Sequence, residues 1–498
     1  MRRSTVQNIA WNYAGHLYQI AINLALTAYV VRRVSVPEYG LYLLVLSISA
    51  TLYLLDMGLS NLLVQAYVAV NDEKDKSGFN ELLGTSFLTL MLLGIIGVAV
   101  FYGFSRMLPG PFNIPHVYVH EASVLFILAS LIVFSGFCSM AIEQAYRGML
   151  RFDRLNQTQL LTTTVQVIAS IAVLRMGKGI VGLAAVQVGT TALQFVLLTV
   201  LLPRTIPGAR LNPLLFRFRT LRPFLHLSFW AFINNLSGYL FDVLVWIILG
   251  SLGTMTDAAL FGLASKAPRQ IWNLVDKGAS VALPLLSESS AESDQTALRR
   301  TFLQTQMVVF GAVLPFVILG ALFARPLIRL VAGPQYMGAV PVMQWLLVAA
   351  FSHAIGYASD QLLYACNEVK KAATMSFCGG ALSVLCALIL VPNYGAMGLA
   401  AGLAITQFLV NCIWFTFTAC QIANIAFFDL LSVLLNGLTW PMVVLIAELG
   451  LVWGISAYIS PYWLLALGVI SGAVYLGVWA FSIALPLYRS QSPAEIMD

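Results

Sequence analysis

The feature that most constrains this chain is a succession of apolar stretches, each long enough to cross a bilayer as a helix. A transmembrane helix needs about 20 consecutive apolar residues, and its backbone polar groups must be satisfied within the segment. Charged residues make up only 10% of the 498 residues, whereas a soluble domain carries about 25%. We therefore predict an all-α, polytopic membrane protein. Fourteen spans are expected near 9–30, 40–62, 82–104, 122–144, 158–175, 180–202, 226–250, 258–286, 302–324, 340–364, 372–391, 396–420, 431–456 and 462–486.

Three short strings recur along the chain at a nearly constant offset. Gly179-Ile-Val-Gly-Leu-Ala-Ala returns as Gly395-Ala-Met-Gly-Leu-Ala-Ala. Asp56-Met-Gly-Leu-Ser returns as Asp276-Lys-Gly-Ala-Ser, and Glu143-Gln returns as Asp360-Gln. Six spans separate the members of each pair. The pattern predicts two six-helix lobes related by a parallel repeat, plus two C-terminal helices.

The same register gives the expected domain organisation. We predict an N-lobe over 1–202, a basic cytoplasmic linker over 203–225, a C-lobe over 226–420, and two further helices with a short cytoplasmic tail over 421–498. Most Lys and Arg residues fall in segments that lie in the cytoplasm if the N-terminus does, and this bias indicates that both termini are cytoplasmic. The net charge of +6 reflects this bias, so no nucleic-acid partner is expected.

Motifs for common chemistries are absent from the sequence. Met176-Gly-Lys-Gly lacks the leading glycine and the Ser or Thr of a P-loop, and we find no nucleophile elbow, zinc-protease or dinucleotide fingerprint. The five histidines are scattered along the chain. We expect neither a metal nor another cofactor, and no enzymatic activity.

Polar residues recur at helical spacing inside several predicted spans. Intramembrane polar residues usually face a bundle interior or a watery cavity, so each stripe predicts a wet helix face. The stripes are Asn8, Asn12, His16, Gln19, Asn23 and Thr27 in span 1; Ser49, Tyr53, Asp56 and Ser60 in span 2; Asn235, Tyr239, Asp242 and Trp246 in span 7; and His353, Tyr357, Asp360 and Tyr364 in span 10.

Span 8 carries the most charged stripe, with the cations Lys266, Arg269 and Lys277 on a face that also holds Asn273. Two interpretations stay open. Asp242, Asp276 and Asp360 could neutralise these cations in a structural ion-pair network. Alternatively, the cations bind a substrate phosphate, for which the forked donors of Arg269 are well suited.

Acidic residues elsewhere have simpler interpretations beside a functional one. Asp56 is expected to cap or brace a helix beside Gly58 and Ser60, and Glu143 to pair with Arg147 one turn away. Asp56, Asp242 and Asp360 are also candidates for coupling to a proton or sodium ion.

The chain resembles one family from about residue 5 to 425, and four motifs carry the resemblance. Arg32-Arg-Val-Ser-Val-Pro-Glu-Tyr-Gly-Leu-Tyr is similar to the Arg…Pro-Glu-x-Tyr/Phe-Gly-x-Tyr signature of polysaccharide (O-antigen and exopolysaccharide) flippases. These belong to the multidrug/oligosaccharidyl-lipid/polysaccharide exporter superfamily. Asp56-Met-Gly-Leu-Ser, Gly333-Pro-Gln-Tyr and Pro392-Asn-Tyr-Gly-Ala-Met-Gly resemble further elements of the family.

The resemblance implies a flippase of the cell inner membrane that translocates polyprenyl-diphosphate-linked oligosaccharide repeat units by alternating access. It implies a cationic cavity, which Lys266, Arg269 and Lys277 could supply, and contacts to sugars from the polar stripes. A polysaccharide polymerase and a chain-length regulator become candidate partners. The residues expected to bind substrate are Lys266, Arg269, Asn273, Lys277, Asn23, Tyr53, Asn235 and Tyr357.

Three other functions remain as alternatives. A multidrug extruder or a lipid II flippase of the same superfamily would share the fold, but span 1 lacks the carboxylate that cationic drugs favour. A membrane-bound glycan polymerase or ligase would be expected to carry a larger external loop than the stretch near 105–121.

Overall fold

The computed structural model describes residues 18–56, 58–70, 76–107, 112–217, 219, 238–279, 282–291, 295–455 and 461–484. Throughout these ranges the regular structure is helical, without a strand, which confirms the all-α prediction. The chain divides into two compact units, Met1–Ala259 and Leu260–Asp498. The domain boundaries predicted at 202, 225 and 420 stay predictions.

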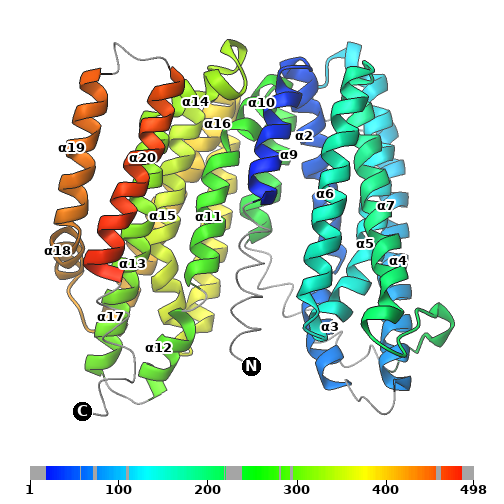
Figure 1. The fold of residues 1–498 in the computed structure, drawn as a ribbon, viewed down its shortest axis with the longest axis horizontal. Helices are drawn as coiled ribbons and strands as arrows, with labels where there is room; N and C mark the ends of the chain where they lie inside the picture. The colour runs from blue at the N-terminus through cyan, green and yellow to red at the C-terminus, as the bar shows by residue number, and fades with distance from the viewer. Residues whose placement is uncertain are drawn as a thin grey trace. The chain divides into compact units, whose positions relative to one another are not determined.

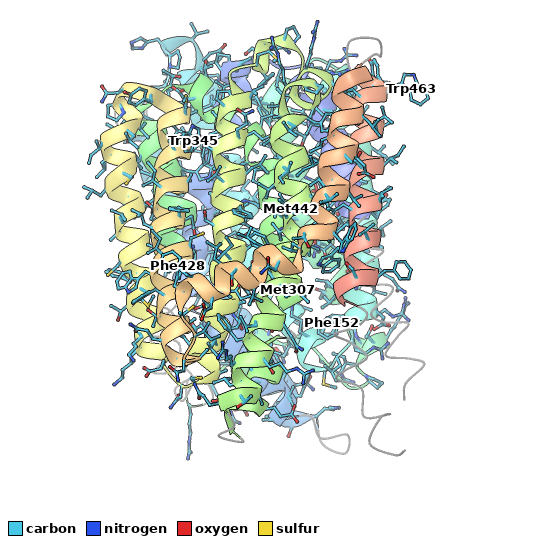
Figure 2. All side chains as sticks on the ribbon, turned by 90° about the vertical axis from the view of Figure 1, so that its left-hand side faces the viewer. Phe152, Met307, Trp345, Phe428, Met442 and Trp463 are labelled. Atoms are coloured by element: carbon cyan, nitrogen blue, oxygen red, sulfur yellow. The ribbon has the colours of Figure 1, made fainter. Side chains whose placement is uncertain are left out.

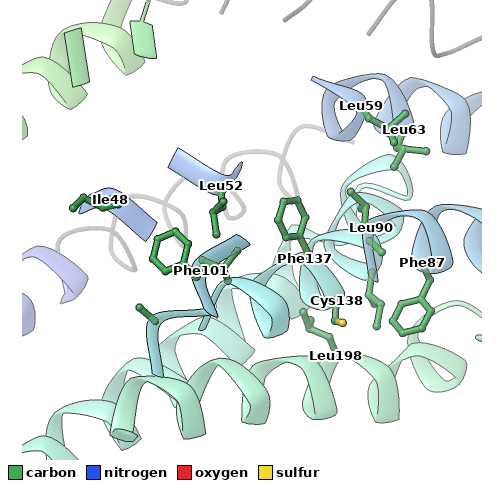
Figure 3. Packing of buried hydrophobic residues seen from close by; sticks show 14 of the residues in the cluster. Ile48, Leu52, Leu59, Leu63, Phe87, Leu90, Phe101, Phe137, Cys138 and Leu198 are labelled. Carbon is green, nitrogen blue, oxygen red and sulfur yellow. The ribbon is translucent and has the colours of Figure 1, made fainter. Parts of the chain in front are cut away.

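The N-terminal unit is built around one buried helix. This helix, α5, packs against the long helices α4 and α7 (Figure 1). Its side chains Phe126, Phe137 and Tyr146 are fully buried, and Figure 3 shows the surrounding packing of apolar side chains. After the helix Tyr18–Val31, the elements are α2 (Val36–Ala50), η1 (Thr51–Asp56), α3 (Leu59–Ala69), α4 (Ser77–Met107), η2 (His116–Tyr118), α5 (Val119–Gly148), α6 (Phe152–Arg175), α7 (Gly179–Thr205), η3 (Pro213–Leu215), η4 (Leu240–Leu244) and α9 (Val245–Leu252). The boundary between the units falls within α10 (Met255–Ala264).

The C-terminal unit has the corresponding central helix in α15, which packs on α11, α13 and α16. Figure 2 shows α18 running across its neighbours before α19 turns along them, and the two are bent by 56°. Phe428 of α18 is largely exposed. The elements are α11 (Lys266–Ala279), α12 (Ala282–Ala291), α13 (Gln295–Leu322), α14 (Ala324–Val331), η5 (Pro334–Tyr336), α15 (Ala339–Ala365), α16 (Val369–Gln407), η6 (Phe408–Phe415), α17 (Thr416–Ile422), α18 (Phe427–Gly437), α19 (Thr439–Ile455), α20 (Pro461–Trp479) and η7 (Ala480–Ala484).

Within the described ranges, 9 helices are long and apolar enough to cross a membrane, or up to 10 when the bent pair α18–α19 counts as one span. This result confirms a multi-pass membrane protein. The predicted number of fourteen stays a prediction, because the expected span at 226–250 lies partly outside the described residues and others are broken into shorter helices.

Two predicted spans are not continuous helices. Span 40–62 contains a 3-10 segment at Thr51–Asp56 and a left-handed Gly58, with φ of 76°, before α3 begins. Span 258–286 is interrupted at Ser265, between α10 and α11. Pro268 lies in the first turn of α11, where a missing backbone N–H is tolerated. Apolar runs give the length of a span but not these breaks, because the breaks depend on single residues.

The predicted internal repeat is visible in the backbone of each unit. Leu150, in the α5–α6 turn, and Asn367, in the α15–α16 turn, both have left-handed backbones, with φ of 54° and 61°. In the α5–α6 turn the backbone N–H of Arg151 donates to the carbonyl of Tyr146. In the α15–α16 turn the backbone N–H of Glu368 donates to the carbonyl of Leu363. Leu150 and Asn367 are separated by the same number of residues as Glu143 and Asp360. The two turns are therefore equivalent parts of the internal repeat.

The repeated glycine string forms the same tight hairpin twice. Gly179 and Gly395 have φ of 55° and 53°, and each lies where an apolar stretch reverses direction. A Cβ on Gly182 would collide with Val173, and one on Gly398 would collide with the carbonyl oxygen of Leu390. The segment Val369–Ile422 therefore holds two antiparallel halves joined at Gly395. The predicted role of these glycines, close backbone packing, is confirmed.

Capping boxes mark equivalent helix starts. Ser35 and Glu38 exchange hydrogen bonds at the start of α2, and Thr254 and Asp257 do so at the start of α10. In each box a side-chain hydroxyl accepts from a backbone N–H and a carboxylate accepts from another. The two boxes are separated by nearly the same offset as the other repeated features.

Candidate functional site

The polar residues predicted in span 8 lie on one amphipathic helix, α11. Its buried positions are Pro268, Ile271 and Val275. Lys266 and Asn273 are half-buried, whereas Arg269 is exposed. Residues three and four apart share a helix face, so Lys266, Arg269 and Asn273 lie on the side of α11 opposite its apolar contacts.

Lys266 has no carboxylate partner within the described part of the chain. A half-buried ammonium in an apolar bundle is costly unless an anion compensates it. The backbone of Lys277 belongs to α11, but its side chain lies outside the described residues. The cationic pair that can be placed is therefore Lys266 and Arg269.

Asp276, at the end of the same stripe, contacts a histidine of α15 rather than a lysine or arginine. Asp276 Oδ1 lies 3.2 Å from Nε2 of His353. The imidazole of His353 also stacks on Trp272, with ring centroids 5.0 Å apart, and the hydroxyl of Tyr357 donates to the backbone carbonyl of Asp276 at 3.4 Å. These contacts fasten the C-terminal half of α11 to α15.

Asp360 lies one turn beyond this cluster on α15 and is half-buried. Its carboxylate accepts from Nε2 of Gln361 at 3.5 Å, and in the described structure it pairs with neither Lys266 nor Arg269. The side chain of Asp242, in the π-helical segment η4, lies outside the described residues. The network of three acids and three cations thus stays a prediction, and the observed side-chain contact of Asp276 is with His353.

Asp56 in the N-terminal unit braces the start of α3. The backbone N–H and the hydroxyl of Ser60 both donate to its carboxylate, the hydroxyl at 2.7 Å. The same hydroxyl lies 2.8 Å from Sδ of Met140 on α5. The structural role predicted for Asp56 beside Gly58 and Ser60 is therefore present.

Tyr53, within η1, points at α5. Its ring centroid lies 5.2 Å from that of Phe137, and its hydroxyl occupies the space that a Cβ on Gly136 would need. Glu143, further along α5, accepts from Nε2 of Gln194 at 3.0 Å and lies 3.9 Å from Arg147. The predicted Glu143–Arg147 pair is confirmed.

The remaining predicted binding residues are only partly placed. Asn23 lies in the helix Tyr18–Val31, is exposed, and donates to the carbonyl of Gln19 at 2.8 Å. Asn235 lies outside the described residues, as do Asn8, Asn12 and His16 of the same predicted stripes.

The sequence placed His353 and Asp276 on two separate stripes and did not predict their contact. The repeat contained a usable signal, because Asp276 corresponds to Asp56 and Tyr357 corresponds to Met140, which adjoins the Asp56 brace. The position of the first copy that corresponds to His353 is Gly136, so the histidine is specific to the second copy.

Comparison with known proteins places the chain in a family. The family model "Polysaccharide biosynthesis protein" matches residues 30–341. The fold is similar to that of "Lipid II flippase MurJ, inward closed conformation", with a TM-score of 0.73 and 14% identity over 96% of this chain and 100% of that chain. An inward-facing "multidrug resistance MATE family transporter of the MOP superfamily" gives a TM-score of 0.66 and 18% identity over 82% of this chain and 94% of that chain. A MOP superfamily transporter from Pyrococcus furiosus gives a TM-score of 0.53 and 16% identity over 82% of this chain and 93% of that chain.

No curated protein matches the chain. At these identities the solved structures show a shared fold alone, whereas the family model extends over more than half of the sequence. The resemblance to polysaccharide exporters is thus confirmed, and the chain belongs to the polysaccharide biosynthesis protein family, with the fold of MOP superfamily transporters.

Proposed function

We propose that this protein is a flippase that carries a polyprenyl-diphosphate-linked oligosaccharide from the cytoplasmic to the periplasmic leaflet of the inner membrane. The family match supports a role in polysaccharide biosynthesis. The fold supports transport by alternating access, because the related folds are those of a flippase and of multidrug transporters. Such a protein moves its cargo without breaking covalent bonds, so we propose a transporter rather than an enzyme.

The observation that carries this proposal is the pair Lys266 and Arg269 on the polar face of α11. Lys266 is half-buried and lacks a carboxylate partner in the described part of the chain. A diphosphate supplies several anionic oxygens, and charge-assisted hydrogen bonds to it offset the cost of holding the Lys266 ammonium inside an apolar bundle. Lys277 belongs to the same proposed site through its place on α11.

Neutral polar residues are proposed to contact the sugars. Asn273 lies one turn beyond Arg269 on α11, and Tyr357 adjoins the other end of that helix. Asn23, Tyr53 and Asn235 complete the proposed set. Aromatic faces and amide groups suit a glycan, which presents both C–H surfaces and hydroxyl groups.

Three acids, Asp56, Asp242 and Asp360, are proposed to couple transport to a proton or sodium ion. Both termini are proposed to lie in the cytoplasm, as the distribution of Lys and Arg favours. A polysaccharide polymerase and a chain-length regulator are proposed partners, because both would act on the exported repeat unit.

The proposal can be tested by export from cells that lack the chromosomal copy. The double variant Lys266→Gln/Arg269→Gln should accumulate in the membrane at the normal level and export little surface polysaccharide. The matched control is Arg325→Gln/Arg329→Gln, which removes two exposed cations from the short helix α14. This control should restore export. Normal surface polysaccharide with the α11 double variant would contradict the proposed site.

The same deletion strain separates the rival cargoes. A loss of surface polysaccharide with unchanged drug susceptibility and unchanged viability supports the proposed cargo. Increased sensitivity to cationic drugs alone would favour a multidrug extruder, and lethal deletion with arrested peptidoglycan synthesis would favour a lipid II flippase.

A further inference from the structure

The contact between a carboxylate of α11 and a histidine of α15 has no counterpart among the described residues of the N-terminal unit. There, the carboxylate of Asp56 accepts hydrogen bonds from Ser60, and the position that corresponds to His353 is Gly136. In the C-terminal unit the equivalent acid, Asp276, lies 3.2 Å from an imidazole nitrogen. A hydroxyl cannot gain a proton near neutral pH, whereas histidine changes its charge between about pH 5 and 8. The second copy therefore has a titratable group where the first has none.

We propose that His353 and Asp276 form a proton-binding site that controls how firmly α11 is held on α15. With a hydrogen on Nε2, the neutral imidazole donates to Asp276. A proton taken up at Nδ1 gives an imidazolium, and the contact becomes a charge-assisted hydrogen bond between opposite charges. No bond between heavy atoms changes, and the single proton returns to water when the site empties.

The surroundings of the pair suit reversible proton binding. Half of the Asp276 side chain (52%) and a quarter of the His353 side chain (24%) are exposed, so protons can reach both groups. Trp272 stacks on one face of the imidazole, and Tyr357 approaches it edge-on with ring centroids 5.8 Å apart. These two aromatic contacts orient the imidazole ring.

The pair is surrounded by polar and titratable groups of α15 and of the elements packed against it. Asp360 of α15 interacts electrostatically with both His353 and Asp276, and Tyr357 interacts with Asp276 and Asp360. From η6, Sγ of Cys412 lies 4.0 Å from the carbonyl of Ser352, next to His353. From α13, the uncharged Gln306 donates to Ile355 and Ser359, and from α12, Ser290 contacts Cys366. Asp360 is therefore a second carboxyl group that acts on the pair.

One member of the pair, Asp276, lies on the helix that carries the proposed diphosphate site. Asp276 follows Arg269 by seven residues, which is two turns along α11. A stronger or weaker hold on this end of α11 changes the freedom of the helix that presents Lys266 and Arg269. This use of the proton site, as the coupling device of transport, rests on the proposed function; the proton site itself does not.

Trp272 provides a direct readout, because a protonated imidazole in ring contact quenches indole fluorescence. The purified full-length protein in nanodiscs is titrated from about pH 8 to 5, and the emission of Trp272→Phe is subtracted to isolate Trp272 from the other tryptophans. The Trp272 signal should fall as pH falls. The fall should disappear in His353→Gln and persist in His116→Gln, which removes a histidine at the start of η2.

A second variant keeps the test valid if His353→Gln alters the fold. Asp276→Asn retains a side chain that can accept from Nε2 but removes its charge, so the midpoint of the fluorescence change should move to lower pH. A Trp272 signal that does not vary with pH, or one that varies equally in His353→Gln, would overturn the proton site.

Measurements of polysaccharide export separate the existence of the proton site from its role in coupling. If the fluorescence change depends on His353 but His353→Gln and Asp276→Asn export polysaccharide normally, the coupling role is overturned while the proposed cargo stands. If Lys266→Gln/Arg269→Gln exports normally while the Trp272 titration behaves as expected, the proposed function fails and the proton site stands. Loss of export in both sets supports both.

Discussion

Leu150 and Asn367, at equivalent positions of the two copies, adopt the same left-handed backbone conformation, although only asparagine favours it. A left-handed backbone costs a residue with a Cβ roughly 1–2 kcal/mol, and asparagine is among the few residues that visit it readily. The side chain of Leu150 is 74% exposed, so it gains little from packing in return. The first copy therefore keeps the left-handed turn although Leu150 is poorly suited to that backbone conformation.

Leu150→Asn should therefore stabilise the protein by roughly 1 kcal/mol, because the strain is relieved and no buried contact is lost. The thermal midpoint of the purified protein, followed by fluorescence, checks this expectation. Asn367→Leu is the reciprocal variant and should lower the midpoint. An unchanged midpoint in both variants would mean that these turns are not strained.

Gly398→Ala should destabilise the protein by about 1–3 kcal/mol, because the new methyl group would meet the carbonyl oxygen of Leu390. Gly189 is the matched control: it lies within α7, and no atom outside its own helix surroundings lies within 4 Å of a Cβ added there. Gly189→Ala should be neutral or stabilising, since alanine is the better helix former. Equal midpoints for the two alanine variants would contradict the hairpin at Gly395.

The close contact between the Tyr53 hydroxyl and Gly136 predicts that substitutions at the two positions compensate each other. Gly136→Ala alone should be destabilising, because its methyl group would occupy the place of the Tyr53 hydroxyl. Tyr53→Phe removes that hydroxyl, so the double variant should be more stable than the sum of the single effects predicts. A double-mutant cycle from denaturation midpoints measures this coupling, and additive effects would show that the two residues do not touch.

Asp56→Ala should cost about 1 kcal/mol of stability, the usual effect of losing a helix cap, because Ser60 loses its acceptor. Asp56→Asn should retain most of that stability, since an amide oxygen can still accept from the N–H of Ser60. The comparison also bears on coupling. If Asp56→Asn is stable but fails to export polysaccharide, the negative charge itself is needed for transport.

The sequence predicted the architecture well because its signals are additive over many residues. Long apolar runs indicated the membrane helices, and the Gly179 and Gly395 strings indicated the repeat that the backbone confirms. The breaks at Thr51–Asp56 and before Lys266 were not predicted, because a few residues in a 3-10 turn or a first-turn proline leave average hydropathy unchanged.

The site was predicted only in part for a related reason. Helical spacing placed Lys266, Arg269 and Asp276 on one stripe of α11, and the structure agrees. Spacing along one helix does not tell which neighbouring helix it meets, so the contact of Asp276 with His353 required the packing of α11 on α15. The repeat could have pointed to it, because the equivalent Asp56 adjoins the equivalent helix.

The central claim is that Lys266 and Arg269 bind the diphosphate of a lipid carrier. The direct measurement is the affinity of the purified protein for undecaprenyl diphosphate, compared between the native sequence, Lys266→Gln/Arg269→Gln and the control Arg325→Gln/Arg329→Gln. Hydrogen bonds to charged groups contribute about 1.5–3 kcal/mol each, so the α11 double variant should bind at least about 100-fold more weakly. The control should bind like the native protein. Equal affinity of all three proteins would contradict the account.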